Sequence, residues 1–165
     1  MKKEYLQRRS CGYWNIGNCI AIDKAQTYNE LFDIAIDFIP RMPQPLIQFC
    51  GPISTGGKGL IESNLAELDK AILFFAVKGV SIFDQIPFEE PMQRIKSSKQ
   101  NYNYDLLNQF YVPIFQSGYI KKFVFLPGWE SSVGARWEHD WAKKYGIKIE
   151  YLPNNWYEDD YDLVI

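Results

Sequence analysis

Short apolar runs alternate along the chain with longer segments in which apolar residues recur at helical spacing. The short runs are residues 46–50 (LIQFC), 80–83 (VSIF), 123–126 (FVFL) and 147–152 (IKIEYL). Each has the length of a buried strand and is followed by a turn or by a change of periodicity. The pattern therefore predicts four β-strands.

The longer segments predict helices over residues 27–39, 60–78, 103–117 and 133–146. Gly79 and Gly146 are placed to end two of them, and Pro113 interrupts the third. Strands that alternate with helices in this way form parallel sheets with right-handed crossovers. We therefore expect a flavodoxin/Rossmann-like three-layer α/β sandwich, with a parallel sheet of four to five strands and helices on both faces.

The remaining segments carry weaker signals. Residues 85–91 (QIPFEEP) and 93–103 (QRIKSSKQNYN) are rich in proline and polar residues and are interpreted as a turn and a loop. Residues 11–22 suit either a hairpin or an irregular flap, and the acidic, aromatic tail from residue 154 is expected to fold over a neighbouring surface. We expect residues 1–45 to be an extension packed on residues 46–165, within one structural domain.

Composition narrows the classes of partner. The 165 residues are 47% hydrophobic and carry a formal charge of −2, so a core is expected but no basic field for a nucleic-acid polymer or a membrane. Three cysteines without repeated spacing and the lack of an apolar leader favour a cytoplasmic protein. A single histidine and no CxxC or HxxxH spacing argue against zinc, and neither a metal nor an organic cofactor is expected.

The first polar segment that follows a strand and precedes a helix is Gly51–Gly59 (GPISTGGKG). Backbone N–H groups and the helix dipole attract anions at such a junction, so the segment is a candidate cradle for a phosphate or a sugar hydroxyl. It is not a P-loop, because the lysine comes one residue late. The alternative is a flexible turn with a solvated lysine. The candidate binding residues are Gly51, Ile53, Ser54, Thr55, Gly56, Gly57 and Lys58.

The second polar segment, residues 127–132 (PGWESS), precedes the helix that carries Glu138. A helical side chain leans over the residues three and four positions earlier, which here are the small Ala135 and Gly134. We therefore expect an open carboxylate at the loop end, with the N–H groups of Ser131 or Ser132 holding an anion nearby. Such a carboxylate is a candidate nucleophile or base. The alternative is a solvated glutamate, with the serines acting only as helix caps.

FCGPISTGGKG (49–59) and LPGWESSVGARWEHDWA (126–142) together resemble the nucleoside 2-deoxyribosyltransferase superfamily, closest to the 2'-deoxynucleoside 5'-phosphate N-hydrolase-like branch. The resemblance covers roughly residues 46–152, and its second motif falls on Ser132, Gly134 and Glu138. It implies that Glu138 attacks C1' of the sugar to form a glycosyl-enzyme ester. Serine rather than aspartate at position 132 implies a 5'-monophosphate substrate, because an aspartate would repel a phosphate dianion.

One departure from the resembled family concerns the general acid. An aspartate is usual at a position that here falls near Pro113, where no acid stands. Asp84 or Asp105 is a candidate replacement, although Asp84 also suits a turn and Asp105 a helix N-terminus. Trp129 is a candidate for stacking on a base, or else a core residue. His139 is expected to be a surface or packing residue, and Cys50 a packing residue.

The sequence therefore predicts an enzyme that hydrolyses the N-glycosidic bond of a (deoxy)nucleoside 5'-monophosphate. One alternative is a nucleoside 2'-deoxyribosyltransferase that uses the same site. A second alternative is a catalytically weak nucleotide-binding sensor or sequestering protein. The expected partners are a small-molecule nucleotide or nucleoside and a second copy of the chain, because members of the resembled family form dimers in which a partner completes each pocket.

Overall fold

The computed structural model describes residues 13–97, 104–158 and 161–163, and the chain divides into two compact units. The first unit consists of residues 1–45 and 84–120, and the second of residues 46–83 and 121–165. The expected division after residue 45 coincides with a boundary between units. Residues 84–120, however, group with the N-terminal segment rather than with the segments around them.

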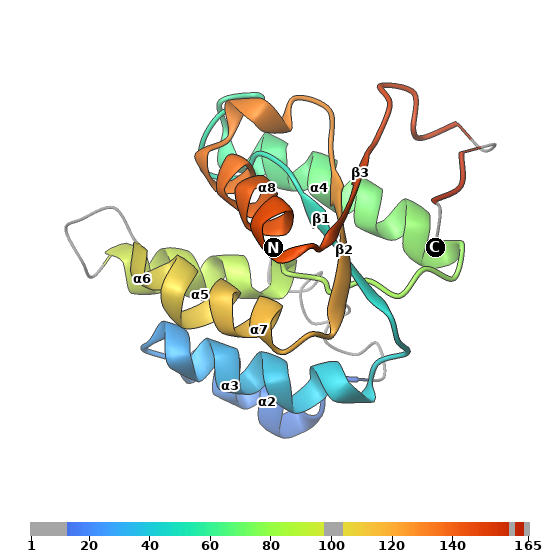
Figure 1. Cartoon of the computed structure of the whole chain (residues 1–165). Coiled ribbons are helices and arrows are strands. Elements are labelled where there is room, and N and C mark those ends of the chain that lie inside the picture. Colours follow the sequence, from blue (N-terminus) through green and yellow to red (C-terminus); the bar gives the residue numbers. More distant parts are fainter. Residues whose placement is uncertain (1–12, 98–103, 159–160, 164–165) are drawn as a thin grey trace. The chain divides into compact units, whose positions relative to one another are not determined.

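The second unit contains a three-stranded parallel sheet in the order β1-β2-β3. Its strands are β1 (Leu46–Cys50), β2 (Ile120–Phe125) and β3 (Lys148–Tyr151) (Figure 1). In β2 and β3, Lys122 pairs with Lys148 and Phe125 with Tyr151. The α/β class and the parallel sheet are confirmed.

The prediction of four to five strands is wrong, because residues 80–83 form only an isolated parallel bridge between Ile47 and Ile82. Ile47 N donates to Ser81 O at 3.0 Å, and Phe83 N donates to Ile47 O at 2.9 Å. Directly afterwards the Asp84 carboxylate accepts a hydrogen bond from Ile86 N at 3.0 Å. This turn starts a helix and leaves the segment too short to extend the ladder.

Two long helices belong to this unit, α4 (Ile61–Val77) and α8 (Val133–Tyr145). Successive side chains of a strand point to opposite faces of the sheet. In β1, Phe49 stacks on Phe75 of α4 at 5.4 Å between ring centroids, whereas the preceding Gln48 donates to Glu138 of α8. The two helices therefore cover opposite faces of the sheet, as predicted (Figure 1).

The described part of the C-terminal tail folds onto α4, as expected. Trp156 is 3% exposed and packs edge-on against Phe74 at 5.6 Å. Lys78 Nζ donates to the Tyr161 carbonyl at 2.7 Å. Residues 159, 160, 164 and 165 lie outside the described part of the chain.

The described part of the first unit is helical. Its elements are α2 (Ile16–Lys24), α3 (Tyr28–Phe38), η1 (Ile39–Arg41), α5 (Ile86–Ser97), α6 (Tyr104–Leu106), the π-helical η2 (Leu107–Tyr111) and α7 (Val112–Gln116). The predicted helix over 103–117 is therefore present from residue 104 onward. Its π turn comes just before Pro113, which lacks the N–H that a regular helix needs. Residue 103 lies outside the described residues.

The expectation of a hairpin or flap over residues 11–22 is wrong, because α2 occupies most of that segment. Asn15 accepts a hydrogen bond from Asn18 N at 2.8 Å, and the Asn18 side chain accepts one from Asn15 N at 3.0 Å. This reciprocal cap fixes the first turn of the helix. Residues 11 and 12 lie outside the described part.

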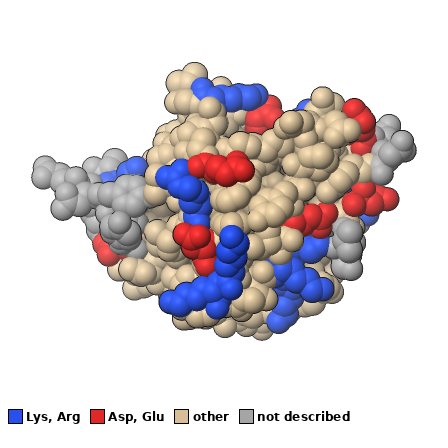
Figure 2. Space-filling model, turned by 45° about the horizontal axis from the view of Figure 1, so that its top comes forward, with Lys and Arg blue, Asp and Glu red and all other residues tan. Residues whose placement is uncertain are grey.

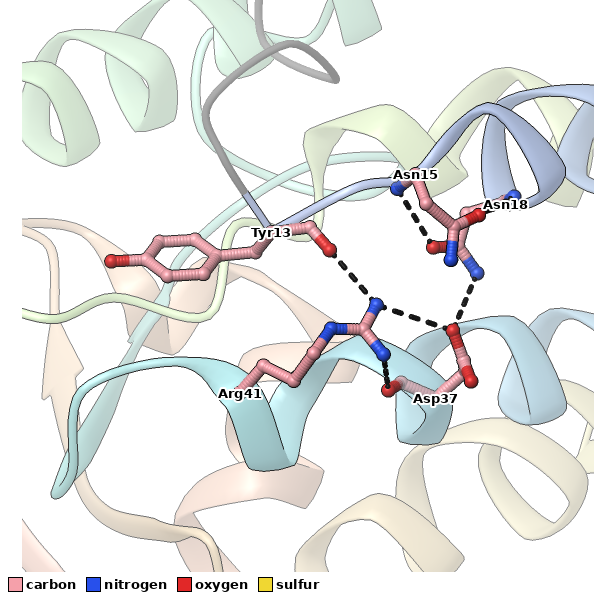
Figure 3. Close-up of polar contacts among 5 residues, drawn as sticks. All are labelled: Tyr13, Asn15, Asn18, Asp37 and Arg41. Carbon is pink, nitrogen blue, oxygen red and sulfur yellow. Dashed lines mark hydrogen bonds and ion pairs between the residues drawn. The ribbon is translucent and has the colours of Figure 1, made fainter.

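A polar cluster joins α2 to α3 (Figure 3). Asn18 Nδ2 donates to Asp37 at 3.0 Å. Arg41 donates to the Tyr13 carbonyl at 3.0 Å and to Asp37 at 3.2 Å. Together Asp37 and Arg41 tie the chain before α2 to the end of α3.

Helix α5 occupies residues for which the sequence predicts a turn and a loop. Pro87 lies in the first turn of the helix, where the missing N–H would have no partner within the helix. Pro91 lies inside the helix, where a proline is unfavourable. Arg94 anchors α5 by donating to the carbonyls of Ala25, at 2.6 Å, and Ile22, at 3.3 Å. Tertiary contacts thus outweigh the proline-rich local pattern. Residues 98–103 of the expected loop are not described.

The described helices and the surface have two further properties. No helix among the described residues is long and apolar enough to cross a membrane. Both acidic and basic side chains appear on the face drawn in Figure 2, in keeping with the formal charge of −2.

Helix α5 also carries a buried acid, Glu89, which is 5% exposed. Burial raises the pKa of this carboxyl from 4.5 to about 7, because a low-dielectric environment disfavours the charged form. Between these two values the folded chain holds a proton that the unfolded chain has lost. The contribution of Glu89 to folding stability therefore falls as pH rises through this window.

We predict that Glu89→Gln reduces the dependence of the free energy of unfolding on pH in this window. The free energy of unfolding, measured by urea titration at several pH values between 5 and 8, should rise in the variant relative to wild type toward pH 8, by roughly 2 kcal/mol. At pH 5 the two proteins should differ little. An equal change at both ends of the range would show that Glu89 is not protonated in the folded protein.

Candidate functional site

The two polar loops meet at the carboxyl edge of the sheet, where parallel strands place ligand sites in α/β folds. Gly57 N donates to Ser131 Oγ at 2.8 Å, and Val133 N donates to Thr55 Oγ1 at 3.0 Å. Thr55 Oγ1 also lies 3.5 Å from Ser132 Oγ. The structure therefore brings the glycine-rich loop against the first turn of α8.

Asn64, which the sequence analysis did not single out, organises the glycine-rich loop. Its Nδ2 donates to the carbonyls of Ile53, at 3.0 Å, and Gly56, at 3.1 Å, and its Oδ1 accepts from Lys58 N at 2.8 Å. Asn64 is 5% exposed. An asparagine shortly after a glycine-rich loop was the available signal.

The expected anion cradle is largely occupied by the protein's own acceptors. The N–H groups of Gly57 and Lys58 donate to Ser131 Oγ and Asn64 Oδ1, and Gly59 N donates to Gly56 O at 3.1 Å. The Lys58 ammonium pairs with the Glu67 carboxylate at 2.6 Å. These groups stabilise the loop in this structure, and binding of a substrate by Gly57 and Lys58 stays a prediction.

The other residues of this loop differ in exposure. Ser54 is exposed, whereas Gly51 is buried. A Cβ on Gly51 would lie 3.3 Å from Leu126 Cβ, so the glycine permits close packing between the ends of β1 and β2.

Ser131 and Ser132 do not offer their N–H groups to an anion, contrary to expectation. Ser131 N donates to Gly128 O at 3.1 Å, and Ser132 N donates to Trp129 O at 2.9 Å. Both bonds belong to the 3₁₀ turn η3 (Trp129–Ser131). The Ser132 hydroxyl accepts from Ala135 N at 3.3 Å and caps α8. Ser132 is therefore a helix cap, and a role of its hydroxyl group in substrate binding stays a prediction.

Glu138 is buried rather than open, because its face of α8 packs on β1. The residue is 8% exposed, and its Oε1 accepts a hydrogen bond from Gln48 Nε2 at 2.8 Å. Burial raises the pKa of the Cys50 thiol well above its usual value, and the charge of the neighbouring Glu138 raises it further. The small Gly134 and Ala135 did not leave the carboxylate bare. Cys50 is a protonated packing residue, as expected.

Gln48 is the second site residue that the sequence analysis missed. It is fully buried, and within the described residues its Oε1 has no hydrogen-bond partner. A glutamine inside an otherwise apolar buried strand is unusual, because burial of an amide is costly unless it is bonded. That position within LIQFC was the available signal.

Trp129 belongs to an aromatic cluster at the end of β2. Its ring centroid lies 4.4 Å from that of His139 and 4.9 Å from that of Phe125, and His139 Nε2 lies 2.6 Å from the Tyr151 hydroxyl oxygen. Desolvation lowers the pKa of His139. His139 is therefore a packing residue, as expected, and Trp129 remains partly accessible.

Asp84 and Asp105, the candidate acids, both belong to the first unit. Asp84 accepts a hydrogen bond from Ile86 N and so serves as the turn former of the alternative interpretation. Asp105 lies in the short helix α6. Their proposed role as general acid stays a prediction.

Two hollows open at the carboxyl ends of the strands within the second unit. The larger, of about 520 Å³, is lined by residues that include Phe125, Trp129, Glu130, Tyr151, Pro153 and Asn154. The smaller, of about 190 Å³, is lined by residues that include Lys58, Asn64 and Trp156. They share Leu126, Pro127 and Asn154. Glu138 lines neither of these two hollows.

The described residues contain no group of three or more histidine, cysteine, aspartate or glutamate side chains that could hold a metal ion. What the second unit offers chemically is a buried carboxylate beside a carboxamide, hydroxyl groups at a helix N-terminus, and an aromatic hollow.

Comparison with known proteins adds one finding. A family described as a domain of unknown function, DUF4406, matches residues 111–151. This stretch contains β2, the loop before α8, and Glu138. No curated protein and no solved structure matches the chain.

We predict that Gly56→Ala destabilises the joined loops more than Gly59→Ala does. Both glycines have a positive φ, of 70° and 78°, and an alanine there costs about 1 kcal/mol. At Gly56 the added Cβ would also overlap the Ser131 backbone, whereas at Gly59 it would meet nothing within 4 Å. Urea unfolding should show a loss of about 2–4 kcal/mol for Gly56→Ala and about 1 kcal/mol for Gly59→Ala. Equal losses would contradict the packing of the two loops.

Proposed function

We propose that this chain hydrolyses the N-glycosidic bond of a (deoxy)nucleoside 5'-monophosphate, with Glu138 as the nucleophile. The proposal depends on one observation, the buried Glu138 carboxylate held by Gln48 on β1. Glu138 also stands on the helix whose first turn meets the glycine-rich loop. Carboxylates placed in apolar surroundings and oriented by a neighbour are typical of catalytic sites.

The proposed reaction has two steps. A Glu138 oxygen forms a bond to C1' as the bond from C1' to the base nitrogen breaks, and the electron pair of that bond leaves with the base, which takes up a proton. Water then attacks C1' of the ester, so that the carboxylate and a sugar 5'-phosphate are released. A carboxylate stabilises the positive charge that develops on the sugar in both steps.

Gln48 supports this role through the orientation of the nucleophile. Its amide donates to one carboxylate oxygen at 2.8 Å, and its own burial leaves it little freedom to move. A carboxylate fixed in this way needs less reorganisation when it attacks C1'.

The hydroxyl groups of Thr55 and Ser132 are the proposed ligands of the 5'-phosphate. They stand at the N-terminus of the 13-residue α8, where the helix dipole favours a negative charge. This assignment replaces the N–H groups of Ser131 and Ser132, which are bonded within the protein. A serine at position 132 also spares the phosphate the repulsion of an aspartate.

A nucleotide-sequestering protein is the second candidate, and a specific observation favours it. The N–H groups of Gly57, Lys58 and Gly59 are all used within the protein, which stabilises a formed loop without supplying catalytic donors. A protein of this kind would bind nucleotides through the same hydroxyl groups and release no base.

We predict that Glu138→Gln abolishes release of free base from a panel of nucleosides and 5'-monophosphates assayed by chromatography. Glutamine keeps the shape of the side chain and the acceptor for Gln48, but its amide is a poor nucleophile, so the rate should fall at least about a thousandfold. Asp140→Asn is the matched control, because that carboxylate lies on the same helix and its side chain is 84% exposed. Its rate should equal that of wild type.

The same assay separates the alternatives. Exchange of bases on addition of a second free base would identify the transferase, and stoichiometric nucleotide binding without release of base would identify the sequestering protein. Base release that survives unchanged in Glu138→Gln would remove Glu138 from the mechanism.

A further inference from the structure

The larger hollow at the ends of β2 and β3 has the properties of a ligand site that the proposed hydrolysis does not use. Its volume of about 520 Å³ falls in the range of small-molecule sites, roughly 300–1,000 Å³. Its residues follow directly from the carboxyl ends of two paired parallel strands, where ligands bind in open α/β sheets. Glu138 is not among the lining residues.

Aromatic rings supply the apolar part of the hollow. Trp129 and Tyr151 both line it, and their rings stack with centroids 5.9 Å apart and an interplanar angle of 25°. Tyr151 is 51% exposed although it lies in a strand. An exposed ring that is already held parallel to a second ring provides a fixed face for a planar ligand.

The polar groups of the hollow include two acceptors, a negatively charged carboxylate and a neutral carboxamide oxygen. Among the described residues that line it, Glu130 alone carries a charge, and Asn154 contributes an amide. Arg136 donates to the main-chain oxygen of Glu130, and its side chain is not part of the lining. A ligand with N–H donors would satisfy these acceptors, whereas a phosphate dianion would be repelled by the Glu130 carboxylate.

We propose that the hollow formed by Trp129, Glu130, Tyr151 and Asn154 binds a planar heteroaromatic ligand that carries N–H donors and no phosphate, of the chemical class of a free amino-bearing nucleobase. The ring packs on the exposed face of Tyr151. Its amino and ring N–H groups donate to Glu130 and Asn154. This site is independent of Glu138 and of the proposed hydrolysis.

The test uses adenine as the probe and the full chain as the protein. Saturation-transfer NMR and calorimetry should detect adenine binding. Tyr151→Ala should weaken it about tenfold, whereas Tyr151→Phe, which keeps the ring, should stay within about threefold of wild type. Thermal unfolding of each variant shows that the fold is kept. Adenosine 5'-monophosphate should displace adenine at least about tenfold less well than unlabelled adenine does.

Charge and location are tested by further variants. Glu130→Ala should weaken adenine binding. It should also reduce the ratio between the affinity for adenine and the affinity for the monophosphate. Glu62→Ala is the control, because it removes an exposed acid in the first turn of α4. It should leave both the adenine affinity and this ratio unchanged. Adenine binding should persist in Glu138→Gln, so that failure of the hydrolysis proposal leaves this one standing.

Three results would overturn the proposal. They are no adenine binding at about 10 mM, binding that is equal in wild type and Tyr151→Ala, and displacement of adenine by the monophosphate as readily as by adenine itself.

Discussion

The hydrogen bonds between the glycine-rich loop and the first turn of α8 are the constraint on which the site depends. Parallel strands bring the two loops to one edge of the sheet, and side chains of Thr55 and Ser131 join them by accepting from Val133 N and Gly57 N. The first N–H groups of a helix have no partner inside the helix. Thr55, in the glycine-rich loop, accepts a hydrogen bond from one of these groups, Val133 N. The loop therefore also helps to fix the position at which α8 begins. Five residues after this starting point, Glu138 lies against β1.

The same bonds decide which groups remain for chemistry. N–H groups that hold the loop in place cannot also bind a substrate without the loss of a protein hydrogen bond, and each such loss has a cost of about 1 kcal/mol or more when the group is buried. The site therefore relies on side chains. Hydroxyl groups can donate and accept together, and a carboxylate held by Gln48 keeps a fixed orientation in a dry environment.

The sequence was most informative where local signals and tertiary packing agree. LIQFC predicted β1 to the residue, and the pattern over 60–78 placed α4 within one residue at either end. It was least informative where contacts between distant segments determine the secondary structure. Arg94 anchors a helix at a proline-rich segment, and a two-bond bridge replaces the expected strand at Ile82. Gln48 and Asn64 were missed because the importance of a buried amide depends on its partners, which only the folded chain supplies.

Sheet order separates the two chemically distinct regions of the second unit. Glu138 is held at β1, whereas the aromatic hollow lies at the ends of β2 and β3. Neighbouring strands lie about 4.8 Å apart, so β1 and β3 are roughly 10 Å apart across β2. We therefore expect a ligand of the hollow to be a species other than the proposed substrate, because the charge of Glu130 selects against the phosphate that this substrate carries.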